Sequence, residues 1–171
     1  GGINGSLDFL TCQALRLTFA QQTWDMTRLA GFLQSHDAYY PQRFSLPAFI
    51  DNHDMNRFLF AAHGNLQLEI MALQLLYFMP GAPSVYYGTE AGVSQHQSIH
   101  EGGALGFDEA RLPMPWEDEG RFPLSNFLQQ LARLRAAWHL GSPLPLSILH
   151  ADDQTLVVQR GALLLALNRA G

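Results

Sequence analysis

Residues 49–59 constrain this chain most, because there the sequence changes abruptly from apolar residues to a cluster of polar and ionisable side chains. The preceding apolar run, residues 46–50, is short and predicts a buried strand. That strand leads directly to Asn52, His53 and Asp54, so it delivers three polar side chains to its carboxyl end. Parallel α/β folds place their active sites at that end of their strands. We therefore expect the functional site there.

A second stretch, residues 79–90, repeats this design one strand-and-helix unit later. Residues 65–79 have apolar side chains at helical spacing, which predicts a largely buried helix. A Gly/Pro turn ends that helix, residues 84–87 predict a brief buried strand, and Glu90 follows it. Two such units in series predict a parallel barrel.

The sequences Phe-Ile-Asp-Asn-His-Asp (residues 49–54) and Pro-Gly-Ala-Pro-Ser-Val-Tyr-Tyr-Gly-Thr-Glu (residues 80–90) occur in this order. With them the chain resembles the α-amylase family of glycoside hydrolases (glycoside hydrolase family 13), especially its neopullulanase and cyclomaltodextrinase-like branch. The resemblance implies an α/β fold: the C-terminal part of a (β/α)8 TIM barrel, about three strand-helix units, followed by an incomplete antiparallel β domain. It assigns residues 1–140 to the barrel and residues 141–171 to the beginning of a truncated C-terminal β-sandwich domain.

The remaining elements follow from periodicity, capping residues and the same resemblance. Helices are predicted over residues 11–19, with Thr11 as the cap, over residues 26–33, and after Ser125, which is the predicted cap of the last helix. By analogy with the family, residues 6–10 form the sixth barrel strand. Short strands of the second domain are expected at residues 146–149, 155–160 and 163–167.

Asn52, His53 and Asp54 are consecutive, so their side chains point in different directions and cannot all be buried. A His-Asp pair taken alone is compatible with a purely structural hydrogen bond. Burying an aspartate without partners is costly, so three such residues at a strand end favour a polar site, and sugar hydroxyls supply the donors that Asp54 needs. In the family, the matching aspartate stabilises the oxocarbenium-like transition state and the histidine donates to the same sugar. The resemblance therefore implies that Asp54 is catalytic and that His53 and Asn52 bind substrate.

Two further residues are candidates for substrate binding, each with a structural alternative. Arg57 is either a sugar contact or a surface charge or salt-bridge partner, and Glu90 is either an outer sugar contact or a support for the site. Residues 88–120 lack periodicity and predict a long loop over the active-site face. Within this loop, residues 111–116 resemble the Arg-x-Pro-Met-x-Trp segment of the family, which implies that the segment anchors the loop and that Trp116 is packed.

Retaining hydrolysis requires a nucleophilic carboxylate and a second carboxyl group that acts as acid and base. In the family both come from strands that precede the sixth, in an Arg-x-x-x-Asp arrangement and a Gly-Glu strand. Neither pattern occurs in this sequence. We therefore expect a fragment of a retaining α-glucosidic hydrolase or transglycosylase that contributes the transition-state-stabilising aspartate and is inactive alone.

Composition excludes several other classes of function. The net charge of −5, from 10 Lys and Arg against 15 Asp and Glu, provides no basic patch for nucleic acid and favours a neutral substrate. No run reaches the roughly 18 apolar residues of a membrane span, and residues 1–10 show no signal-peptide pattern. Cys12 is predicted to be a small buried residue, and Trp138, in a helical stretch, is predicted to lie in the core. No cofactor or metal is predicted from this chain, because the family's usual calcium ligands would lie upstream, and localisation stays open.

The expected partner is an α-glucan oligosaccharide such as a maltooligosaccharide. A partial barrel leaves unpaired strand edges and an exposed apolar face, which predicts self-association or pairing with the missing half.

Two alternatives come from other classes. The His53-Asp54 dipeptide also occurs in metal-dependent phosphohydrolases, in which a His-Asp pair on a helix binds a metal with help from distant residues. In the second alternative, the chain is part of a non-catalytic relative that keeps an amylase-like barrel as a scaffold or binding module.

Overall fold

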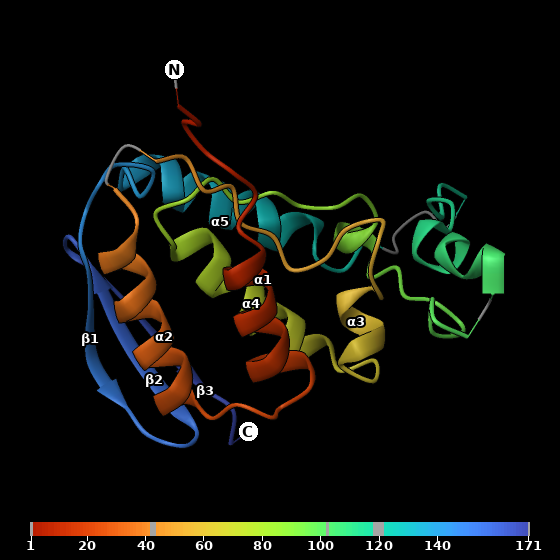
Figure 1. The fold of residues 1–171 in the computed structure, drawn as a ribbon, viewed down its shortest axis with the longest axis horizontal. Helices are drawn as coiled ribbons and strands as arrows, with labels where there is room; N and C mark the ends of the chain where they lie inside the picture. The colour runs from red at the N-terminus through yellow and green to blue at the C-terminus, as the bar shows by residue number, and fades with distance from the viewer. Residues whose placement is uncertain (1, 42–43, 102, 118–121, 171) are drawn as a thin grey trace.

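The computed structural model describes residues 2–41, 44–101, 103–117 and 122–170, which form a helical layer with a small antiparallel sheet along one side (Figure 1). The predicted loop over residues 88–120 therefore falls partly outside the described residues, at Gly102 and at residues 118–120. The elements in chain order are α1 (Phe9–Leu15), the π-helical turn η1 (Arg16–Ala20), α2 (Met26–Tyr39), α3 (Phe58–Ala61), α4 (Leu66–Phe78), the 3₁₀ turns η2 (Thr89–Ala91) and η3 (Gly103–Arg111), α5 (Ser125–Ala137), β1 (Leu146–Ala151), β2 (Thr155–Arg160) and β3 (Leu163–Asn168).

Three short segments before the site lie side by side in parallel, as the barrel prediction requires. Ala48 is the central residue, with parallel bridges to Asp8 on one side and Pro83 on the other. Its backbone N donates to the Ala82 carbonyl at 2.9 Å, and its carbonyl accepts from the Ser84 N at 2.7 Å. The chain thus contains three consecutive strand positions of a (β/α)8 barrel.

These strands are shorter than the sequence predicted. The segment predicted at residues 6–10 ends at Asp8, because α1 begins at Phe9. Within the described residues, the segment predicted at residues 84–87 pairs with the central segment through residues 82–84. The segment predicted at residues 46–50 pairs only near Ser45 and Ala48. Each segment gives way early to the turn or helix that follows it.

Side-chain oxygens at three helix starts satisfy backbone donors, although two predicted caps are wrong. Asp8, not Thr11, caps α1 by accepting from the Thr11 N at 2.9 Å. Ser125 is the first residue of α5 rather than its cap, and the preceding Leu124 offers no side-chain acceptor. Asp25 and Asn65 cap α2 and α4 through their side chains.

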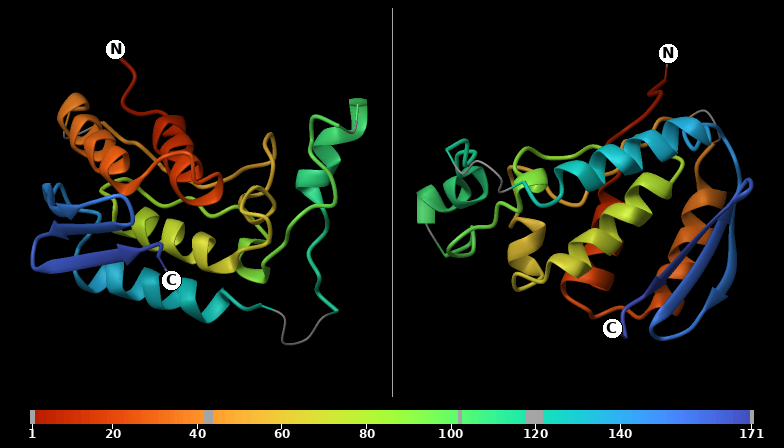
Figure 2. Two further views of the ribbon diagram at one scale, coloured as in Figure 1. Left: turned by 90° about the horizontal axis from the view of Figure 1, so that it is seen from below. Right: turned by 180° about the vertical axis from the view of Figure 1, so that it is seen from behind.

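The antiparallel sheet has the order β1-β2-β3 and packs against α2 (Figures 1 and 2). β2 matches its predicted range, residues 155–160, while β1 and β3 extend slightly beyond theirs. Alternate β2 residues, including Leu156 and Val158, are buried in the same apolar core as the inner sides of α2 and α4. The β segment therefore shares one continuous core with the helices. No helix among the described residues is both long and apolar enough to cross a bilayer.

Arginine side chains join the sheet to the helical layer through backbone carbonyls. The Arg160 guanidinium, 1% exposed, donates five hydrogen bonds to carbonyls of Phe78 and of the 140–144 connection. Arg135 on α5 donates to four carbonyls between Tyr77 and Gly81. These contacts fix the end of α4 and the entry to β1 in one place.

Two other predictions about single residues are now decided. Cys12 is buried as predicted, and burial raises its pKa to about 12, so the thiol is unreactive at neutral pH. Trp138, predicted in the core, is half-exposed, because it lies at the end of α5 beyond the packed stripe of that helix.

Candidate active site

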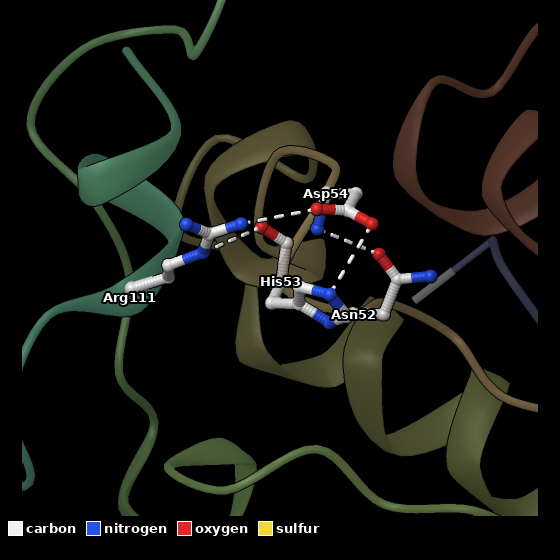
Figure 3. A network of polar contacts seen from close by, with 4 residues as sticks. All are labelled: Asn52, His53, Asp54 and Arg111. Carbon is white, nitrogen blue, oxygen red and sulfur yellow. Dashed lines mark hydrogen bonds and ion pairs between the residues drawn. The ribbon is translucent and has the colours of Figure 1, made fainter. Parts of the chain in front are cut away.

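Asn52, His53 and Asp54 form an exposed polar turn directly after the central parallel segment (Figure 3). The Asp54 N donates to the Asn52 side-chain oxygen at 2.8 Å, which tightens the turn. The His53 Nε2 lies 3.2 Å from the Asp54 Oδ2, and the two side chains are 58% and 60% exposed. The structure thus brings the three predicted residues together with an accessible carboxylate.

The carboxyl ends of two neighbouring parallel segments meet at this turn. The His53 ring lies 6.4 Å from the ring of Tyr86, which follows the third segment. Because parallel strands end at the same edge of a sheet or barrel, this contact places His53 and Asp54 at the rim where such folds carry their chemistry.

Arg111, at the end of η3, approaches the same carboxylate from the opposite side (Figure 3). Its Nη2 lies 3.1 Å from the Asp54 Oδ1, and its Nε donates to the His53 carbonyl at 3.2 Å. Exposed ion pairs contribute at most about 1 kcal/mol to stability, so this contact matters for position rather than for folding. The Tyr87 hydroxyl donates to the Leu112 carbonyl at 2.9 Å and secures the chain next to Arg111.

The Arg-x-Pro-Met-x-Trp segment therefore reaches the site through its arginine, while the prediction for its tryptophan is wrong. Trp116 is 73% exposed, and the centre of its ring lies 6.3 Å from that of the tilted Phe122 ring. It extends from the loop instead of packing beneath it.

Arg57, predicted as a sugar contact or a surface charge, is 1% exposed. Its Nη1 donates to the Tyr87 carbonyl at 2.7 Å, and its guanidinium lies 4.0 Å from the centre of the Tyr86 ring. The surface-charge alternative is wrong, because the side chain is buried, and a direct sugar contact of Arg57 stays a prediction.

Glu90 lies in η2 and is half-buried. Its carbonyl accepts from the Leu124 N at 3.1 Å, so its backbone ties the turn after the third segment to the start of α5. This contact agrees with the supporting alternative and leaves a sugar contact of the carboxylate as a prediction.

No sequence pattern indicated a role for Gln95, which is buried beneath the turn. Its Oε1 accepts from the Arg57 N at 2.6 Å, and its Nε2 donates to the Asn56 Oδ1 at 2.8 Å. A single glutamine in an aperiodic stretch has no recognisable pattern, so its role is visible only from its contacts.

Two buried acids lie below the polar turn. The Asp51 Oδ2 accepts from the Phe58 N at 2.7 Å, and burial raises the pKa of Asp51. Burial, together with the nearby Asp51, raises the pKa of Glu69 to about 8, although Arg57 acts in the opposite direction. Glu69 is therefore protonated at neutral pH.

Replacing Glu69 by Gln is expected to remove a pH dependence of stability. The folded protein holds this proton up to about pH 8, whereas an unperturbed glutamate releases it near 4.5. Because the folded state binds the proton more tightly, its contribution is complete below pH 4.5 and is lost as the pH rises toward 8. Between pH 5 and pH 7 the free energy of unfolding of the wild type should fall by about 2 kcal/mol relative to Glu69→Gln.

Urea denaturation at both pH values measures this difference. Glu117→Gln, which changes an exposed acid, is the matched control and should follow the wild type. Parallel pH profiles of wild type and Glu69→Gln would show that Glu69 titrates normally.

The site gives no support to a His-Asp metal centre. His53 and Asp54 lie in a turn, not on the helix that such a centre uses. Within the described ranges, no group of three or more His, Cys, Asp or Glu side chains is arranged to hold a metal ion.

Comparison with known proteins identifies the family. The model of the α-amylase catalytic domain matches residues 6–132. "Alpha-amylase 2" of Dictyoglomus thermophilum is 31% identical over 136 residues, which cover 79% of this chain and 24% of that protein. A cyclomaltodextrin glucanotransferase of Paenibacillus macerans is 40% identical over 84 residues, which cover 49% of this chain and 12% of that protein. The chain thus spans about a quarter or less of these relatives.

Solved structures show the same fold. A cyclomaltodextrinase superposes with a TM-score of 0.83 at 23% identity, covering 96% of this chain and 28% of that chain. The cyclic α-maltosyl-(1→6)-maltose hydrolase of Arthrobacter globiformis, in complex with maltose, superposes with a TM-score of 0.69 at 25% identity, covering 95% of this chain and 36% of that chain. This chain therefore belongs to the α-amylase family of glycoside hydrolases, as its parallel segments, its Asn-His-Asp turn and the match to the catalytic-domain model show.

Proposed function

We propose that this chain supplies the transition-state-stabilising aspartate, Asp54, to the α-glucan site of a retaining α-glucosidic hydrolase or transglycosylase. The observation that supports it most is the accessible Asp54 carboxylate, which His53 and Arg111 contact on its two oxygens at the rim of the parallel segments. We also propose that residues 1–140 belong to the catalytic barrel and residues 141–171 to the start of its β domain.

The proposed chemistry uses charge that appears only during reaction. An oxocarbenium-like transition state makes the neighbouring ring hydroxyls stronger donors, so a fixed carboxylate binds it more tightly than the ground-state sugar. Asp54 has exposed lone pairs for two such hydroxyls, and His53 offers a ring N–H to the same sugar. The family patterns of the nucleophile and of the acid/base glutamate do not occur in this sequence. The proposal therefore assigns both residues to other strands of the barrel.

A neutral, starch-like oligosaccharide fits this site. The chain carries a net charge of −5, which disfavours polyanionic substrates. Tyr86 and Tyr87 add aromatic surface beside His53, and aromatic rings pack well against sugar faces. Asn52 and Glu90 complete the proposed set of substrate contacts.

The complete reading frame that encodes this chain provides the test. Its product should release reducing sugars from maltooligosaccharides or pullulan and contain both missing carboxylates. Binding of maltooligosaccharides without cleavage would instead favour a non-catalytic amylase-like module. A product that neither binds nor cleaves these sugars would overturn the α-glucan assignment.

In isolation, the chain is expected to self-associate through its first parallel segment. Within the described residues, residues 5–8 pair on one side only, and the adjoining Leu7, Phe9 and Leu10 are 55%, 53% and 56% exposed. An unpaired edge beside exposed apolar side chains favours association. Sedimentation velocity should show concentration-dependent oligomers.

The variant Leu7→Gln/Leu10→Gln should shift the protein toward monomer. Tyr39→Gln, which removes a still more exposed aromatic side chain (79%) on α2, is the control and should not. A wild-type chain that stays monomeric at high concentration would contradict this surface.

A further inference from the structure

Residues 52–57 form a short loop. A hydrogen bond between Asp51, which precedes the loop, and Phe58, which follows it, joins its two ends. The Asp51 Oδ2 accepts from the backbone N of Phe58 at 2.7 Å, and Asp51 is 3% exposed. Phe58 is the first residue of α3, so the same bond satisfies a donor at the start of that helix. The bond connects the residues on either side of the loop. One buried carboxylate therefore closes the base of the loop that presents Asp54.

The second limb of this loop is fixed independently. The Arg57 N donates to the Gln95 Oε1 at 2.6 Å, and the Gln95 Nε2 donates to the Asn56 Oδ1 at 2.8 Å. The Arg57 Nη1 donates to the Tyr87 carbonyl at 2.7 Å. In the first limb, Arg111 contacts His53 and Asp54 from the side, and Asp51 holds the base.

The charges beneath the loop favour this arrangement. Arg57 is buried beside two acids, Asp51 and Glu69, and favours the charged form of each. Within the described part of the chain, Asp51 accepts a hydrogen bond from the backbone next to the loop, and Glu69 does not. A buried carboxylate bound to a backbone N–H makes a strong, directional contact, so Asp51 has the geometry to hold the loop and Glu69 does not.

We propose that Asp51 is a positioning residue for Asp54: by closing the base of the 52–57 loop, it sets the direction in which Asn52, His53 and Asp54 face a bound sugar. This inference rests on the proposed function, since it assigns Asp51 a part in the same site. Asp51 does not touch substrate, because it is buried below the turn. It acts only through the loop.

The first experiment needs no activity. Amide hydrogen exchange of this chain should show faster exchange at Asp54, whose N–H is bonded to Asn52, in Asp51→Ala than in wild type. Asp51→Asn keeps an oxygen that accepts from the Phe58 N, so it should restore slow exchange. Asp37→Ala, an exposed acid on α2, is the matched control. Unchanged exchange in a folded Asp51→Ala protein would overturn the inference whatever the enzyme does.

The second experiment is a double-mutant cycle in the complete enzyme on a maltooligosaccharide. Loss of a hydrogen bond to a charged group predicts that Asp51→Ala lowers kcat about 10- to 100-fold with little change in KM. Asp51→Asn should recover most of kcat. In an Asp54→Asn background, Asp51→Ala should cost less than about threefold, because its effect passes through Asp54.

The outcomes separate the two proposals. An active enzyme in which Asp51→Ala keeps the wild-type kcat, or loses equal activity with and without Asp54, retains the proposed function and overturns the positioning role. A wild-type enzyme inactive on all α-glucans overturns the proposed function and, with it, any role of Asp51 in sugar chemistry.

Discussion

Asp54→Asn in the complete enzyme is expected to lower kcat on maltooligosaccharides about a thousandfold, because contacts that strengthen in the oxocarbenium-like transition state are together worth several kcal/mol. Asparagine is nearly isosteric and keeps one oxygen, so the sugar still binds. The asparagine side chain lacks the negative charge that stabilises the growing positive charge at the reacting carbon. The effect should therefore fall mainly on kcat, with a smaller change in KM.

Steady-state kinetics of the variant beside Asp37→Asn measures this effect. Asp37 is an exposed acid on α2, away from the turn, and its replacement should leave both constants unchanged. Circular dichroism shows whether Asp54→Asn is folded, which the exposed position of Asp54 favours. A variant that retains more than a tenth of the wild-type kcat would remove Asp54 from the catalytic machinery.

The sequence predicted the elements whose pattern is local. The Asn-His-Asp turn, the apolar helix that became α4 and the strand at residues 155–160 each have a clear periodicity or an abrupt change of polarity. Family resemblance placed Ser6 and its neighbours beside the central segment, which no periodicity would have done. These features were predictable because a few adjacent residues determine them.

Contacts between distant residues were not predictable in this way. Arg111 reaches Asp54 across 57 positions, and Arg57 donates to Tyr87 across 30. An arginine has the same side chain on the surface and in the interior, so its burial depends on which carbonyls the fold brings to it. The Asp8 cap was not predicted, because the strand predicted at residues 6–10 includes Asp8. Strand ends and helix starts compete for the same few positions.

Another long-range network, the one around Arg160, leads to the strongest stability prediction. Arg160→Met is expected to lower the free energy of unfolding by about 4 kcal/mol, because it removes a buried charge-assisted network and leaves several carbonyls without donors. In the wild type, Arg160 reaches the carbonyls of Phe78 and Leu140 at 2.7 Å each. Burial and the nearby Arg135 lower its pKa to about 10, which still leaves it charged at neutral pH.

Arg160→Lys separates charge from geometry, because an ammonium group cannot reproduce the planar fork that spans Phe78 and the 140–144 connection. It should recover less than half of the loss. Arg28→Met is the matched control: Arg28 lies 4.5 Å from the centre of the Trp24 ring, and its loss should cost about 1 kcal/mol or less. Urea denaturation measures all three variants. Equal, small effects of Arg160→Met and Arg28→Met would show that apolar packing alone holds the sheet against the helices.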